Sequence, residues 1–131
     1  MRQAIEPNPG RVFPGMSQAV RVGNQLHVSG QVAFDANGDL VGRDDPEQQA
    51  DQCFANIAQL LDAAGATPAD VVSLRCFLVD ADCYAAYADA KRRFLADVAV
   101  PPAGTAVIVA GLLVPGLLME IEAVAVIEEE G

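Results

Sequence analysis

The sequence predicts an α+β fold in which two helices lie on one face of a mixed, six-stranded sheet. Three observations support this prediction. Short β-rich runs separated by turn dipeptides open the chain, a strongly periodic helical segment follows, and apolar runs then flank a second helical segment. The predicted order of elements is ββ(β)αβαββ, where the parentheses mark the strand with the weakest sequence signal. The length of 131 residues fits a single domain over residues 1–131.

The first strands are predicted from turn signals. From Ser17 onward, short runs rich in β-formers are interrupted at Gly23-Asn24 and again at Asn37-Gly38. Glycine and asparagine tolerate positive φ at low cost, as the tight turns of β-hairpins require. We therefore expect an antiparallel meander with a turn at each dipeptide.

The first helix is predicted over residues 46–64. Asp45 is a good N-cap, Pro46 suits the first helical position, and Gln48 has the spacing of a capping box. The helix is expected to end at Gly65. Its apolar residues recur at helical spacing, at Ala50, Cys53, Phe54, Ile57, Leu60, Leu61 and Ala64.

The second half of the chain predicts a strand, a helix and two further strands. Residues 71–79 are β-branched, apolar and too short for a good helix. A second helix is expected between Tyr84 and the pair Pro101-Pro102, with its basic residues near the C-terminal end of the helix dipole. Two strands at about 103–110 and 117–127 and a solvated tail at 128–131 complete the expected order.

Composition excludes several classes of function. The chain has 8 Lys plus Arg against 18 Asp plus Glu, and a formal charge of −10 repels nucleic acids and anionic lipids. Residues 1–14 lack the continuous apolar run of a signal peptide, and residues 106–121 are too short and too interrupted to span a membrane. We therefore expect a cytoplasmic protein that binds neither nucleic acid nor membranes.

Few residues suit metal or cofactor chemistry. The three cysteines, Cys53, Cys76 and Cys83, include no CxxC pair, which favours reduced thiols, although Cys83 near a helix start has a possible lowered pKa. The single histidine, His27, lies in a strand-like run and favours a structural imidazole. No nucleotide-binding glycine motif is present. Arg75 is left with two interpretations, pairing with a carboxylate or anchoring a substrate.

The last strand carries the most informative residues. Glu120 and Glu122 lie in an apolar strand and share one face of it, because side chains alternate between faces. Two interpretations stay open. The glutamates protect a sheet edge from aggregation, or one is a partly buried carboxyl whose raised pKa suits proton transfer.

Several segments together resemble the Rid family, the YjgF-like reactive-intermediate deaminases. The resemblance runs from about Ser17 to Ile127 and rests on SQAV, VGN, VSGQ, LLDAAGA, DVVSLRCFLVD and the terminal EIEAVA. It implies a chorismate-mutase-like subunit, a homotrimer with clefts between neighbouring subunits, and hydrolysis of small-molecule imines or enamines without metal or organic cofactor. It also implies that Glu120 manages the water, while the backbone of Ser29 and Gly30 lines the cleft.

Three positions depart from the family pattern. Gly104 stands where active members carry an arginine that holds the substrate carboxylate, Met16 replaces a common tyrosine, and Ala88 replaces a frequent asparagine. A larger and less positive pocket favours a bulkier or less acidic substrate. The backbone of Gly104, together with Thr105, is then available to bind a carbonyl oxygen.

Two alternatives accompany this hypothesis. In the first alternative, the chain keeps the fold but is a non-catalytic protein that binds a small molecule or assembles the enzymes of a pathway. The other alternative comes from relatives reported as ribonucleases or translation inhibitors, and the charge of −10 opposes it.

Overall fold

A computed structural model describes residues 1–128 and contains one six-stranded sheet with the order β1-β2-β3-β6-β4-β5. Only the pair β4 and β5 is parallel, so the sheet is mixed, which confirms the predicted fold class. Of the expected C-terminal tail, Glu128 alone lies within the described residues, and it is exposed. The strands are β1 (Arg2–Ile5), β2 (Ala19–Val22), β3 (Gln25–Gln31), β4 (Val71–Leu78), β5 (Ala103–Ile108) and β6 (Met119–Val126).

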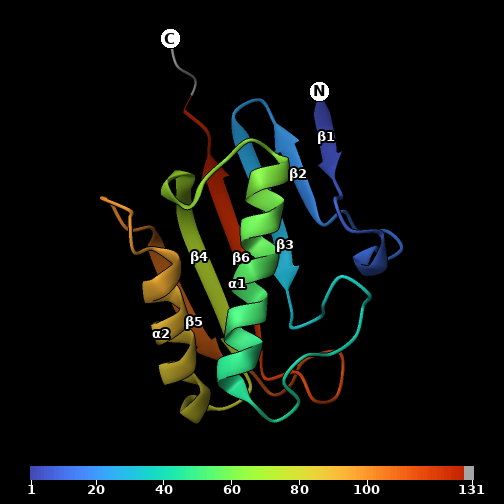
Figure 1. The fold of residues 1–131 in the computed structure, drawn as a ribbon, viewed down its shortest axis with the longest axis vertical. Helices are drawn as coiled ribbons and strands as arrows, with labels where there is room; N and C mark the ends of the chain where they lie inside the picture. Colours follow the sequence, from blue (N-terminus) through green and yellow to red (C-terminus); the bar gives the residue numbers. More distant parts are fainter. Residues whose placement is uncertain (129–131) are drawn as a thin grey trace.

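Both helices, α1 (Pro46–Ala63) and α2 (Tyr84–Phe94), lie on the same face of the sheet (Figure 1). Three short 3-10 helices, η1 (Pro9–Arg11), η2 (Pro68–Asp70) and η3 (Ala81–Cys83), connect the elements. Within residues 1–128, neither helix has the length and apolar character needed to cross a membrane. No helix of the described residues lies over the opposite face of the sheet.

The meander at the N-terminus differs from the prediction in one strand. The Gly23-Asn24 turn joins β2 to β3 as expected. The Asn37-Gly38 turn is present, but the residues on its two sides form only an isolated bridge, between Phe34 and Leu40. The Asp35 carboxylate accepts hydrogen bonds from the backbone N–H groups of Asn37 and Asp39, which closes a compact loop in place of a strand. The strand that completes the N-terminal meander is instead β1, which precedes β2 in the chain and pairs with it.

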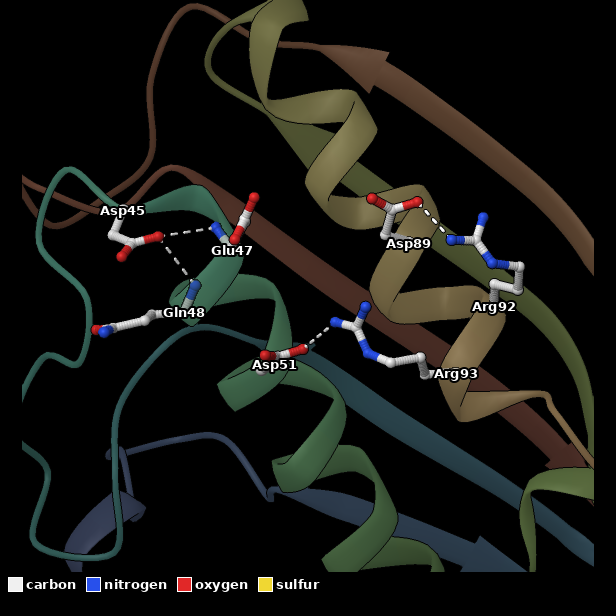
Figure 2. A network of polar contacts seen from close by, with 7 residues as sticks. All are labelled: Asp45, Glu47, Gln48, Asp51, Asp89, Arg92 and Arg93. Carbon is white, nitrogen blue, oxygen red and sulfur yellow. Dashed lines mark hydrogen bonds and ion pairs between the residues drawn. The ribbon is translucent and has the colours of Figure 1, made fainter.

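The first helix agrees with its prediction to within one residue. Its N-cap Asp45 accepts hydrogen bonds from the backbone N–H groups of Glu47 at 3.1 Å and Gln48 at 3.2 Å (Figure 2). The chain then leaves the helix through Gly65, which has a φ of +79°. These local contacts explain why the boundaries were predictable.

The second helix ends at Phe94, well before Pro101. Figure 2 shows how it is joined to α1 at the surface, where Arg93 pairs with Asp51 at 2.6 Å. Both side chains are exposed, so the pair contributes only about 0–1 kcal/mol. The contact that matters more lies beneath, where Phe54 of α1 and Phe94 meet with ring centroids 4.9 Å apart.

The last strand lies at the centre of the sheet, between β3 and β4. The interpretation that its glutamates protect an edge is therefore wrong, because both neighbours already use its backbone hydrogen-bonding groups. Its predicted alternation is confirmed. Met119, Ile121, Ala123 and Ala125 are buried under the helices, while Glu120, Glu122, Val124 and Val126 are half-buried on the other face.

The loops at one end of the sheet are held by Gln49, a fully buried side chain of α1. Its amide nitrogen donates to the backbone oxygens of Gly42 at 3.0 Å and Gly116 at 2.8 Å. Its amide oxygen accepts from the backbone N–H of Leu118 at 2.8 Å. One side chain thus joins the loop before α1 to the loop before β6.

Replacing Gln49 by Met is expected to lower the free energy of unfolding by about 3 kcal/mol, because three half-buried backbone groups lose a fully buried partner. Urea denaturation followed by circular dichroism measures the change. The matched control is Gln48→Met, an exposed neighbour. Equal unfolding free energies for the two variants would show that water replaces the amide without cost.

Candidate functional site

A pocket of about 130 Å³ opens where β3 and β6 meet the loops that precede β2 and β6. Its lining is mainly apolar. The polar lining residues are Arg11, Ser17, Gln18, Ser29, Gly30, Gln31 and Glu120, and the apolar ones are Phe13, Met16, Val32, Phe34, Leu112, Leu113, Val114 and Leu117.

A β-bulge shapes the floor of this pocket. Val28 pairs with Ala123 and Gln31 pairs with Ile121, so Ser29 and Gly30 together oppose the single residue Glu122. The extra residue reverses the alternation of β3, which buries Val28 before the bulge and Gln31 after it. The bulge thereby turns the backbone of Ser29 and Gly30 toward the pocket.

Glu120 lies directly over Gly30. A Cβ atom built on Gly30 would lie 2.6 Å from Cδ, 2.8 Å from Cγ and 3.0 Å from Oε1 of Glu120. Glycine therefore leaves the space that the end of the Glu120 side chain occupies, and a larger residue would make that side chain shift. The contact fixes the Glu120 carboxyl group against the bulge.

The environment of Glu120 favours its neutral form. Burial is the larger cause that raises the pKa of this carboxyl above its usual value, and the negative charge of Glu122 raises it further. Within residues 1–128, no basic side chain forms an ion pair with Glu120. A carboxyl group with a raised pKa on a pocket wall is suited to accept and return a proton.

Ser29 joins the N-terminal loop to the bulge. Its hydroxyl donates to the backbone oxygen of Ser17 at 2.6 Å, and its N–H donates to the backbone oxygen of Gln18 at 3.0 Å. These bonds hold the adjoining Met16 at the mouth of the pocket, where it is half exposed. The structure thus brings together four of the predicted site residues, Met16, Ser29, Gly30 and Glu120.

Gly104 and Thr105 do not join this pocket within one chain. They lie on β5, at the edge of the sheet, where they pair with Leu74 and Arg75 of β4. Because β4 lies between β5 and β6, neither residue is on a strand that neighbours Glu120. They remain a prediction for a site that two copies of the chain would share.

The remaining candidates have other surroundings. Arg75 lies 3.5 Å from the Glu122 carboxylate, which agrees with the pairing interpretation. His27 is exposed on the open sheet face, with a ring nitrogen 3.2 Å from Gln25 Oε1, and so is no core residue. Within residues 1–128, no cluster of three or more potential metal ligands is present.

The described cysteines are free and buried. The possibility of a lowered pKa for Cys83, which its place near a helix start left open, does not hold, because burial and the neighbouring Asp80 and Asp82 raise that pKa. Burial likewise raises the pKa of Cys76 to about 12. These thiols behave as small apolar side chains rather than nucleophiles.

Sequence reasoning missed much of the pocket lining. Arg11 and Phe13 lie in a segment rich in proline and glycine, where no periodicity assigns a side chain to a face. Leu112, Leu113 and Val114 lie in the loop before β6, whose course no local signal predicts. The bulge had one available signal, the loss of alternation after Val28.

The fold and the pocket define a class: a small α+β protein with an apolar pocket built around one carboxyl group. Comparison with known proteins gives the family. The profile described as "Endoribonuclease L-PSP" matches residues 11–127. A RutC family protein of Sulfurisphaera tokodaii is 34% identical over 107 residues, which cover 82% of this chain and 83% of that protein.

Two further relatives agree. A 2-iminobutanoate/2-iminopropanoate deaminase of Dermatophagoides farinae is 32% identical over 112 residues, covering 86% of this chain and 85% of that protein. The crystal structure of a Rid-family protein of unknown function from Yersinia pestis superposes with a TM-score of 0.89 and 29% identity, over 97% of this chain and 100% of that chain. The chain belongs to the Rid, or YjgF, family.

Replacing Glu120 by Gln is expected to stabilise the protein at pH 7. The raised pKa means that the folded state favours the protonated form, so the stability contributed by this group is complete at low pH and is lost as the pH rises through the folded pKa. The variant avoids that loss. Urea midpoints of both proteins should differ at pH 7 and converge below about pH 4.

The control for this measurement is Glu128→Gln, which changes an exposed carboxylate. It should not reproduce the pH-dependent stabilisation. A Glu120→Gln variant that is less stable than the wild type at pH 7 would contradict the argument from burial.

Proposed function

We propose that this protein hydrolyses a reactive imine, enamine or related conjugated intermediate in the pocket at the β3–β6 bulge. The observation that carries the proposal is the position of Glu120, which lies against Gly30 on the pocket wall with a raised pKa. Family membership and the relative named as an iminoacid deaminase support the same class of reaction.

Hydrolysis of an imine requires a group that first accepts a proton and then donates it. The Glu120 carboxylate takes a proton from water as the oxygen bonds to the iminium carbon, which yields a carbinolamine. The carboxylic acid then returns this proton to the nitrogen. As the C–N bond breaks, the Glu120 carboxylate takes the proton of the carbinolamine hydroxyl, so that ammonia and a carbonyl compound are released and the proton then passes to water or ammonia. A pKa raised toward neutrality suits both roles, because the group must be a base in one step and an acid in the next.

The substrate is proposed to be bulkier, or less acidic at its reacting end, than a small iminoacid. Position 104 offers no guanidinium, and Met16 at the mouth adds apolar surface in place of a hydroxyl. Phe13, Phe34 and Leu112 make the rest of the lining apolar. Such a lining binds a hydrocarbon body better than a second charged group.

The active form is proposed to be a cytoplasmic homotrimer. All six residues of the edge strand β5 are exposed and uncharged, and the side chains of Val107 and Ile108 are 42% and 60% exposed. Leu113, on the pocket rim, is fully exposed. Unprotected edges and apolar rims of this kind are covered in stable proteins. Gly104 and Thr105 of one copy would then complete the pocket of a neighbour.

RNA cleavage is not proposed, although the family description names an endoribonuclease. The net charge of −10 opposes contact with phosphates. The alternative that keeps the fold is a non-catalytic protein that binds the same ligands, and the variants below discriminate it from an enzyme.

Replacing Glu120 by Gln is expected to lower the rate of imine hydrolysis by about 100-fold, because proton transfer is lost. Ammonia release above the spontaneous rate, from iminoacids with side chains of increasing size, measures the effect. The wild type should favour the larger substrates. Glu122→Gln, on the same strand but outside the pocket lining, should retain activity within about threefold.

A second variant tests the substrate argument. Gly104→Arg should increase turnover of the smallest iminoacids, and its backbone has room, since the nearest atom to a Cβ is Leu74 O at 3.9 Å. Wild-type protein that hydrolyses small and large iminoacids equally well would contradict the argument. Glu120→Gln protein with undiminished turnover would favour the non-catalytic alternative.

Replacing Ile108 by Lys is expected to dissociate the assembly, because a charge on β5 opposes pairing or packing of that edge. Light scattering coupled to size exclusion should give a trimer for the wild type and monomers for the variant. The control is Val100→Lys, an exposed apolar residue outside the strand. A monomeric wild type at micromolar concentration would refute the proposed assembly.

A further inference from the structure

Arg11 is a buried cation on the pocket lining. It is only 5% exposed, and it belongs to the short helix η1, at the first residue that the family profile matches. Its Nη1 donates to the side-chain oxygen of Asn56 and, at 3.4 Å, to the backbone oxygen of Phe34. Its Nη2 donates to Gln59 Oε1 at 2.6 Å. Every one of these partners is neutral.

Among the described residues, no carboxylate pairs directly with this charge. Within residues 1–128, no acidic side chain lies within ion-pair distance of Arg11. A buried charge is costly unless it is paired, and burial lowers the pKa of this guanidinium by more than the negative charge of Asp35 raises it. A neutral side chain of similar size would avoid this cost, although it could not supply all the hydrogen bonds that Arg11 makes.

The hydrogen bonds around Arg11 are also incomplete. A guanidinium has five N–H donors. The partners named above take three, and the Asn8 side chain, with its amide turned to the better orientation, takes another at 3.1 Å. The Nε donor keeps no partner, and neither does the buried Oε1 of Gln18, which lines the same pocket. Most N–H donors of Arg11 thus have an acceptor, whereas its positive charge has no counterion among the described residues.

The two ionisable groups of the lining, Arg11 and Glu120, form no ion pair with each other. A ligand therefore finds a positive charge at one part of the wall and a proton-transfer group at another. The remaining lining is dominated by apolar side chains such as Phe13, Met16 and Leu112. An anion with a hydrocarbon body complements this arrangement, because its charge balances Arg11 in a site of low dielectric constant.

We propose that Arg11 is the specificity-determining residue of this pocket and that the ligand is an organic acid with an apolar body, whose carboxylate lies at the Arg11 wall. The inference rests on the proposed function where it concerns the reaction, whereas the binding of the organic acid is independent of it. It extends that function by moving the anionic group of the substrate from position 104 to the N-terminal segment of the same chain. Recognition acts mainly through charge, since most donors of Arg11 are already occupied.

Binding of two unreactive probes tests the proposal. Hexanoate and hexanamide have nearly the same shape, and only the acid is charged at pH 7. We expect the wild type to bind hexanoate at least about tenfold more tightly than hexanamide, measured by calorimetry at constant ionic strength. Arg11→Gln should abolish this preference while hexanamide affinity stays within about threefold. Arg11→Lys should keep the preference, because it keeps the charge.

The matched control is Arg75→Gln, which removes an exposed guanidinium outside the pocket lining and should leave the preference unchanged. Equal binding of the two probes by the wild type, or a preference that survives Arg11→Gln, would overturn the proposal. A loss of both affinities together in Arg11→Gln would mean a purely structural role and would overturn it as well. Since neither probe can react, absence of imine hydrolysis would refute the proposed function alone.

Discussion

The site depends on the close approach of Glu120 to Gly30. This approach exists because β6 lies between β3 and β4, so that its backbone is held on both sides, and because β3 contains one extra residue opposite Glu122. Without the bulge, alternation would continue and the backbone of residue 30 would not face the carboxyl group. With a larger residue at position 30, the end of the Glu120 side chain would have to shift from its present position. Position, burial and proton affinity of Glu120 therefore have one common origin.

The charges of this protein divide into two groups with different physical effects. Most of them are exposed, as in the pair between Arg93 and Asp51 in Figure 2, where solvent screens the interaction. Arg11 and Glu120 are instead partly or wholly removed from water, and neither has a partner of opposite charge within the described residues. Unbalanced charges in a pocket are destabilising for the empty protein. They are favourable when a ligand supplies what is missing.

Family membership and local residues answer different questions here. The family and its iminoacid deaminase relative support a general class of chemistry. The lining of the pocket bears on the substrate, and it differs from the family pattern at Met16, while position 104, outside this lining, differs as well. Since β5 places Gly104 at the far edge of the sheet, a cation within the same chain has particular weight. Arg11 is the cation that the lining contains.

Local signals were sufficient for the elements whose contacts are local. The two ends of α1 follow from hydrogen bonds and backbone preferences of nearby residues, namely Asp45, Pro46 and Gly65. Strict alternation likewise assigned Glu120 and Glu122 to one face of β6. The family resemblance then pointed to Ser29, Gly30 and Glu120 as neighbours. All of this was available without coordinates because short-range geometry repeats along the chain.

Long-range pairing determined the rest. The central place of β6, the pairing of β1 with β2, the bulge in β3 and the position of Arg11 against Asn56 each depend on residues far apart in sequence. Such contacts follow from how the whole chain buries its apolar surface, and no window of neighbouring residues contains that information. The proline-rich segment before β2 had no period to read, yet it supplies the buried positive charge of the pocket.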